Sequence, residues 1–215
     1  MLNLGLPTIL SRVLTLIIAF TVHEFSHAFI ATAYGDETPR ENGRLTINPF
    51  AHLDLMGSIL LIVAGFGWAR PVPINPTVLR DKSRYAMMWV SLAGPLSNFL
   101  LAVLAAIPIR FEIVTYTPSG PILPSPFNFL VDFLVINLLL MVFNLIPLAP
   151  LDGDKVLEIL LPGFAGEWFA KIRPFGPMIL LVLLFGLPML GLDLVSMYMQ
   201  PTIKFLLSLL LGANV

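Results

Sequence analysis

Two histidines with a glutamate between them form the group of residues in this sequence best suited to chemistry. Residues 23–27 read His-Glu-Phe-Ser-His, which is the pattern H-E-x-x-H. On a helix, His23 and His27 lie on one face, so both imidazoles can bind one Zn²⁺ while Glu24 lies beside a water molecule. The ion lowers the pKa of that water and the glutamate accepts its proton. The pattern therefore predicts a metal-dependent hydrolase with Glu24 as the general base.

The position of this motif strengthens the metal-site interpretation. With 3 histidines and 6 glutamates in 215 residues, H-E-x-x-H arises by chance in roughly one chain in a thousand. The motif also lies within an apolar run that is long enough to cross a membrane. The alternative is that these side chains are only satisfied polar groups in a helix bundle, which is costly where ionisable residues are rare and usually functional.

A zinc site built on His23 and His27 requires a third protein ligand and an open position for water. Asp152 is the preferred candidate because it follows the apolar run 127–148 and is expected at the same depth as the two histidines. Asp132 is at the opposite end of that run and is expected near the other membrane surface. Two histidines and a carboxylate suit Zn²⁺, and also Fe²⁺ or Co²⁺.

Two further candidates for the third ligand, His52 and Asp54, are in a polar segment after the first apolar run. Both are weaker candidates than Asp152, because loop residues of these types are usually solvated.

The composition defines the class of protein that must hold these groups. Hydrophobic residues make up 57% of the chain and charged residues 12%, and the mean hydropathy is +0.90. A soluble or disordered chain does not have this balance. The 12 Lys+Arg against 13 Asp+Glu exclude a nucleic-acid binder, and the absence of cysteine excludes a thiolate metal ligand. The sequence therefore predicts an all-α polytopic membrane protein within a lipid bilayer.

The apolar runs predict about four to six transmembrane helices in a single membrane-embedded domain, residues 1–215. Clear spans are expected at 4–34, 85–107, 127–148 and 177–194, whereas 55–67 and 202–211 are short for a span. The first helix is expected to begin near Pro7 or Thr8 and to end before Gly35. Around 42–75 we expect a re-entrant or small β element at the membrane surface, with strand character at 44–47, 59–63 and 71–74.

The basic residues predict how the chain is oriented. Segment 35–84 carries six Lys or Arg and segment 148–176 carries three, whereas segment 109–126 carries only Arg110. The positive-inside rule therefore places the two richer segments in the cytoplasm, with the N-terminus outside. The metal site is then expected near the cytoplasmic side of the membrane.

Two motifs together carry a family resemblance. The HEFSH motif and residues 144–153, which fit N-x-x-P-x-x-P-x-D-G at every fixed position, resemble the site-2 proteases, which are intramembrane zinc metalloproteases. Residues 48–54 with Gly57, and residues 93–98, are similar to the compact bacterial members that lack PDZ and CBS domains. The resemblance covers about residues 15–160.

The resemblance implies a role for each matching residue. His23, His27 and Asp152 would bind one Zn²⁺, and Glu24 would act first as general base and then as general acid. Asn144 would stabilise the oxyanion or hold substrate, although an interhelical hydrogen bond is an equal alternative.

Three further residues near the motifs are expected to affect helix packing or the charge at the metal site. Gly94 is expected to permit close helix approach and Asn98 to contact another helix. Asp154 departs from the glycine that many members of the family carry at this position, and it adds negative charge beside the expected metal.

The implied function is an intramembrane endopeptidase that cleaves transmembrane protein substrates in a bacterial cell membrane. The resemblance suggests regulated intramembrane proteolysis, with an anti-sigma factor, a membrane-tethered transcription regulator or a signal-peptide remnant as substrate. An extended substrate is expected to add to an edge within 42–75. One alternative is a metal-ion transporter or channel, but transport needs no general base at position 24. Another is an inactive scaffold, against which the intact motif residues argue.

Overall fold

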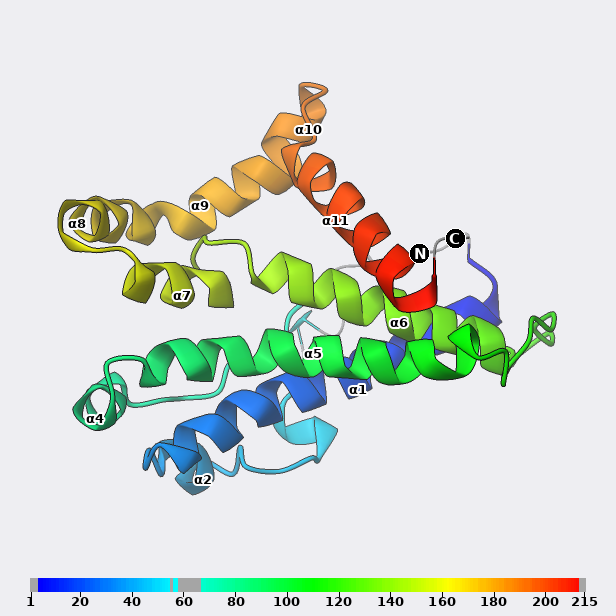
Figure 1. Cartoon of the computed structure of the whole chain (residues 1–215), viewed down its shortest axis with the longest axis horizontal. Helices are drawn as coiled ribbons and strands as arrows, with labels where there is room; N and C mark the ends of the chain where they lie inside the picture. The colour runs from blue at the N-terminus through cyan, green and yellow to red at the C-terminus, as the bar shows by residue number, and fades with distance from the viewer. Residues whose placement is uncertain (1–3, 55, 58–66, 213–215) are drawn as a thin grey trace.

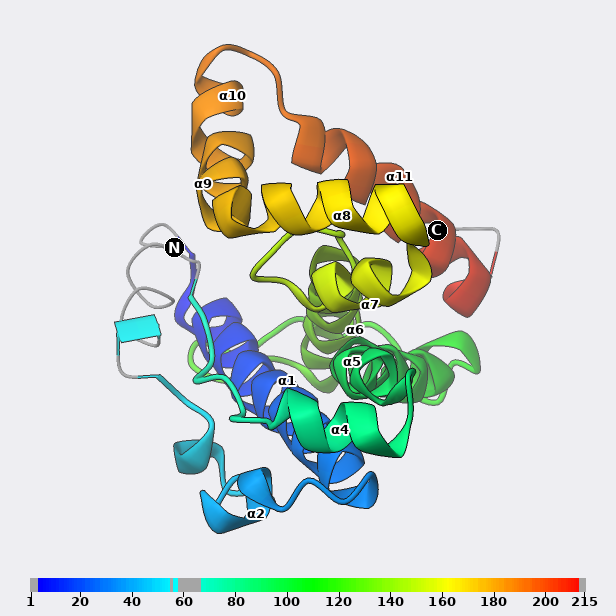
Figure 2. The ribbon, with the colours of Figure 1, turned by 90° about the vertical axis from the view of Figure 1, so that its left-hand side faces the viewer.

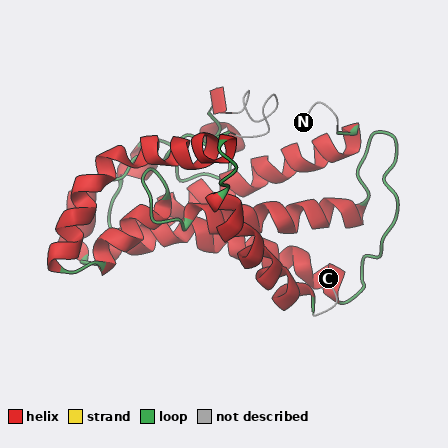
Figure 3. Ribbon diagram, turned by 90° about the horizontal axis from the view of Figure 1, so that it is seen from above, coloured by secondary structure: helices red, strands yellow, loops and turns green. Residues whose placement is uncertain are grey.

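The computed structural model describes residues 4–54, 56–57 and 67–212 and shows a helical molecule (Figures 1 and 3). Within these residues, five helical segments are long and apolar enough to cross a membrane. The predicted all-α polytopic membrane fold is therefore confirmed. In chain order the helices are α1 (Leu6–Ala33), α2 (Thr38–Glu41), η1 (Pro49–Ala51), α4 (Pro76–Lys82), α5 (Ala86–Arg110), α6 (Pro126–Asn144), α7 (Asp152–Leu160), α8 (Gly163–Ile172), η2 (Arg173–Phe175), α9 (Gly176–Leu181), η3 (Val182–Gly186), α10 (Leu187–Met189) and α11 (Leu194–Leu211).

Helices α1, α5 and α6 pack against one another and form the centre of the molecule (Figure 1). Small residues of α5, including Ala102 and Ala106, lie against Leu134 and Leu138 of α6 in a buried apolar cluster. Small side chains let two helix backbones approach closely, which favours association inside a bilayer. The α11 helix packs on α5 and α6 and contributes Ile203 to the same cluster.

The ends of the first three long helices follow local sequence signals. Pro7 is in the first turn of α1, and Gly35 follows the helix with φ +90°, so the predicted ends are confirmed. The predicted span 127–148 is too long, because α6 ends at Asn144. Pro147 explains the earlier end, since proline lacks an N–H and disfavours helical backbone at the residue before it.

The C-terminal third differs more from expectation. The predicted span 177–194 overlaps a candidate span, Gly163–Met189, which begins and ends earlier, runs from α8 to α10 and includes the π-helical turn η3. The short segment predicted at 202–211 is part of the 18-residue helix α11. This helix begins earlier because the side chain of Asp193 accepts a hydrogen bond from the backbone N–H of Ser196.

The strands predicted at 44–47 and 71–74 are absent, and 59–63 and most of 55–67 lie outside the described residues. The described part of this region contains one antiparallel bridge, between Leu53 and Ala69. Prolines in segment 67–75 remove ladder donors, and the guanidinium of Arg44 instead donates to the backbone carbonyls of Ala51, Arg70 and Pro71. This segment is thus held mainly by the Arg44 side chain and not by strand pairing.

The two lysine- and arginine-rich segments lie at the same end of the molecule. Figure 1 shows α2, α4, α7 and α8 at that end, which Figure 2 views directly, and the connection between α5 and α6 at the other. This arrangement is the one required by the charge pattern, since segments 35–84 and 148–176 carry most of the basic residues.

Candidate metal centre

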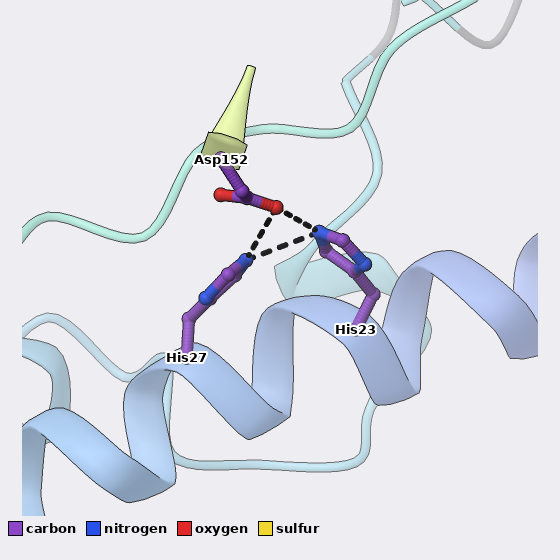
Figure 4. Close-up of side chains that lie close together, drawn as sticks. All are labelled: His23, His27 and Asp152. Carbon is purple, nitrogen blue, oxygen red and sulfur yellow. Dashed lines mark hydrogen bonds and ion pairs between the residues drawn. The ribbon is translucent and has the colours of Figure 1, made fainter. Parts of the chain in front are cut away.

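His23, His27 and Asp152 lie together although 125 residues separate the last two (Figure 4). The histidines are one turn apart on α1, and Asp152 is the first residue of α7. Asp152 Oδ2 is 3.2 Å from His23 Nε2 and 3.4 Å from His27 Nε2. The two Nε2 atoms are 3.0 Å apart. The three side chains that the sequence predicts to lie together are therefore adjacent in the structure.

Hydrogen bonds from the other ring nitrogens orient both imidazoles. His27 Nδ1 lies 2.6 Å from the carbonyl oxygen of Val90, which can only accept, so Nδ1 carries the proton. His23 Nδ1 lies 2.6 Å from Asn98 Oδ1. The amide nitrogen of Asn98 donates to Asn137 Oδ1 at 2.9 Å, which leaves its oxygen to accept from His23. Both Nε2 atoms therefore direct lone pairs into the cluster, as metal-ligating histidines do.

The donor set fits a divalent metal ion. Two imidazole lone pairs and a carboxylate oxygen face one another, and Asp152 Oδ2 is buried without a hydrogen-bond partner. A positively charged metal ion at this point would favour the ionised form of the Asp152 carboxylate. Two nitrogens and one oxygen leave a fourth position open for water.

Two glycines let the elements around the cluster approach this closely. A Cβ atom on Gly94 of α5 would lie 2.4 Å from His27 Nε2 and 2.6 Å from His23 Nε2. A Cβ atom on Gly153 would lie 2.4 Å from the carbonyl oxygen of Leu145, so the glycine after Asp152 lets α7 contact the end of α6. The close approach predicted for Gly94 is confirmed.

Glu24 and Asn144 line the same cavity as the cluster. The cavity has a volume of about 420 Å³, and its wall includes Phe143, segment 67–74 in part and Lys155. Glu24 Oε2 accepts a hydrogen bond of 3.2 Å from the backbone N–H of Val72. Asn144 Nδ2 donates to the carbonyl of Leu140 in its own helix at 2.9 Å, rather than to another helix.

The remaining candidate residues have other partners. His52 is buried and its Nε2 lies 2.7 Å from the Thr46 carbonyl. Asp54 accepts from the Gly57 N–H at 2.9 Å, and Asp132 is 3.7 Å from Arg12 Nε. These carboxylates and this imidazole organise the fold and are not part of the cluster.

Asp154, Asn98 and Asn137 are polar residues near the site that have partners of their own. The expected extra charge of Asp154 is compensated, since Arg173 Nε donates to its Oδ2 at 2.8 Å. Asn98 contacts other helices as predicted, through Asn137 of α6 and His23 of α1. Asn137 was not predicted, although a buried amide within an apolar membrane helix is a signal for such a role.

Comparison with known proteins identifies the family. Bacillus subtilis (strain 168) has a protein named "Putative zinc metalloprotease YwhC", to which the chain is 42% identical over 176 residues, covering 80% of this chain and 78% of YwhC. The chain belongs to this zinc metalloprotease family. It is an enzyme that hydrolyses peptide bonds, and its cofactor is zinc, for which the cluster of His23, His27 and Asp152 provides a fitting donor set.

Other relatives of this zinc metalloprotease carry similar names. Rip2 of Mycolicibacterium smegmatis is 35% identical over 176 residues, which are 78% of this chain and 64% of Rip2. "Zinc metalloprotease MJ0392" of Methanocaldococcus jannaschii is 23% identical over 184 residues, 84% of this chain and 44% of that protein. No family model matches the chain, and no solved structure matches it.

Gly94→Ala is expected to weaken zinc binding by this metalloprotease. The new methyl group would overlap both Nε2 atoms, and overpacking of this kind costs about 1–3 kcal/mol, which corresponds to roughly 5- to 150-fold in affinity. Chelator competition on the purified protein measures the change. Gly186→Ala is the matched control, because a Cβ atom there would meet the Val182 side chain at an ordinary contact distance of 3.5 Å. Equal zinc affinities of the two variants would show that Gly94 does not limit the space at the cluster.

Proposed function

We propose that this zinc metalloprotease is an intramembrane endopeptidase of the site-2 protease type. The observation that carries the proposal is the location of its polar groups on α1, which is a candidate membrane span. His23 precedes the end of that helix at Ala33 by ten residues, or roughly 15 Å along the helix axis. Peptide bonds within or near a transmembrane segment could reach a site at this depth.

Each residue of the site has a role in this proposal. His23, His27 and Asp152 hold the zinc. Zinc, when bound, acts as a Lewis acid that activates water and polarises the scissile carbonyl. The Glu24 carboxylate takes a proton from the water and then gives it to the leaving nitrogen. Its position next to His23 in α1, and its hydrogen bond to the Val72 N–H, keep the carboxylate in the cavity.

Asn144 is proposed to stabilise negative charge on the substrate carbonyl oxygen or to hold the substrate backbone. Its side-chain nitrogen has two hydrogens, and the Leu140 carbonyl accepts one of them. The second hydrogen is available in a cavity that also contains the cluster. A fixed amide donor of this kind is suited to an oxyanion.

The substrate is proposed to bind in an extended form along segment 67–75. A transmembrane helix must unwind before its carbonyls can be attacked, and an exposed backbone edge can then hold it. Segment 67–75 lies outside the helices, and Trp68, Val72 and Ile74 line the cavity. A proline scan of this segment that left cleavage unchanged would remove the edge from the proposal.

The location of the enzyme and its substrates are further parts of the proposal. The basic residues at the end that carries α4 and α7 support a cytoplasmic position for this end of a bacterial cell membrane protein. The resemblance to site-2 proteases supports anti-sigma factors, tethered transcription regulators or signal-peptide remnants as substrates.

Incubation with a model substrate tests the proposal. We expect the purified wild type to cleave a single transmembrane segment flanked by soluble tags, with the cut inside or next to the apolar segment. Mass spectrometry of the products locates the cut. Zinc chelation should abolish the reaction and added zinc should restore it, because zinc would supply the Lewis acid that activates the water. Cleavage confined to the soluble tags would contradict intramembrane proteolysis.

A further inference from the structure

Arg173 forms two ion pairs with α7, the helix that begins with Asp152. Its Nε donates to Asp154 Oδ2 at 2.8 Å and its Nη1 donates to Glu158 Oε2 at 2.7 Å. Asp154 and Glu158 are one helical turn apart, so one guanidinium reaches both carboxylates. Arg173 itself belongs to η2, which joins α8 to α9 and is distant from Asp152 in sequence.

A second contact from the same segment lies on the other side of Asp152. Gly176 is buried, and a Cβ atom there would lie 2.5 Å from the carbonyl oxygen of Ala149. Residues 173–176 therefore contact the chain three residues before Asp152 and two residues after it. Asp152 is thereby held between two contacts with one short segment.

The pair of Arg173 with Asp154 is the more buried of the two ion pairs. The Asp154 side chain is 3% exposed, whereas that of Glu158 is 43% exposed. Exposed pairs contribute little to stability, but removal of one partner from a buried pair leaves an uncompensated charge. Asp154 Oδ1 is buried without a hydrogen-bond partner. Arg173 therefore supplies the compensating charge for Asp154 among the described residues.

We infer that Arg173 is a positioning residue for Asp152 in the zinc site, and that it acts by fixing the first turn of α7 through Asp154. The inference rests on the proposed role of Asp152 as a zinc ligand. Without Arg173, the buried Asp154 carboxylate would move toward water and would take the first turn of α7 with it. The Asp152 carboxylate would then lie less favourably against His23 and His27. Zinc should consequently leave the protein faster.

The test measures zinc release in purified, zinc-loaded protein of full length. Arg173→Gln is expected to accelerate release to a chelator by roughly tenfold, the lower range for an outer partner of a metal ligand. It should also change the visible spectrum of the Co²⁺-substituted protein, which reports the ligand geometry. Arg173→Lys should restore part of the slow release because it keeps the charge. Lys171→Gln is the matched control, since this lysine lies over the Trp168 ring at 6.0 Å and should leave both readouts unchanged.

A double variant separates positioning from general loss of stability. Asp154→Asn combined with Arg173→Gln removes both charges of the buried pair, so its zinc release should be slower than that of Arg173→Gln alone. Release and spectra of Arg173→Gln identical to wild type would overturn the inference. If Arg173→Gln does not fold, Asp154→Asn and Arg173→Lys take its place, and wild-type behaviour of both would overturn it equally.

A parallel measurement on Asp152→Ala distinguishes this inference from the proposed function. If Asp152→Ala loses zinc while Arg173→Gln keeps wild-type release, only the role of Arg173 fails. If Asp152→Ala keeps zinc as firmly as wild type, the proposed ligand fails, and the inference about Arg173 fails with it.

Discussion

Glu24→Gln is expected to keep zinc and to lose proteolysis, with the cleavage rate falling by roughly 10²- to 10⁴-fold, the range for a general base. Glu24 lies between the two histidines in sequence but is not one of the three clustered side chains. Glutamine retains the size of the side chain and an oxygen that can accept from the Val72 N–H. It has no basic oxygen to take a proton from water. This variant is therefore expected to bind zinc without cleaving peptide bonds.

The measurement pairs zinc content with the rate of cleavage of the transmembrane model substrate. Glu37→Gln is the control, because Glu37 is exposed and pairs with Arg40 at 2.9 Å on α2. It removes the same charge outside the cavity and should leave both quantities unchanged. Near wild-type cleavage by zinc-loaded Glu24→Gln would exclude Glu24 as the general base.

Asp152→Ala is expected to reduce the zinc content from about one ion per chain to almost none after dialysis, since only two of the three proposed protein ligands remain. Asp152 Oδ2 lies within 3.4 Å of both Nε2 atoms, and it is the carboxylate of the cluster. Its removal leaves two imidazoles, whose Nε2 atoms are 3.0 Å apart, without a negative ligand. Elemental analysis of the purified variant gives the zinc content directly.

Asp132→Ala is the matched control for this loss. Asp132 is also an aspartate in the apolar part of the chain, but it is 3.7 Å from Arg12 and outside the cluster. This variant should keep its zinc. A zinc content of Asp152→Ala equal to that of Asp132→Ala would remove Asp152 from the proposed ligand set.

The cluster of His23, His27 and Asp152 was predictable because its main signals are local. His23 and His27 are four residues apart on a helix, and that spacing places them on one face in any fold. Asp152 required one further argument, that residues at the same end of two membrane spans lie at similar depth. The conclusion held although α6 ends four residues earlier than the predicted span. Because a membrane restricts where helices can lie, the depth of a residue in the bilayer helps to predict which residues meet.

The contacts that support the cluster were less accessible to sequence reasoning. The bond between His23 and Asn98 depends on the rotation of α5 about its axis, which the apolar pattern of that helix does not define. Arg173 and Asp154 meet because the chain turns back after α8, and no local pattern encodes that turn. The strands expected at 44–47 and 71–74 are absent because of a long-range contact of the same kind. Arg44 binds backbone carbonyls that strand pairing would use.

The division of the proposed ligands between α1 and α7 has a consequence for biosynthesis. Helix α1 carries both histidines and the proposed base, but the carboxylate follows 125 residues after His27. A nascent chain therefore has only two of the three donors until α5 and α6 have been synthesised and α7 has begun. Zinc held by all three donors would stabilise the assembled state of α1 and α7. The proposed donor set is therefore complete only after the three central helices α1, α5 and α6 have been made.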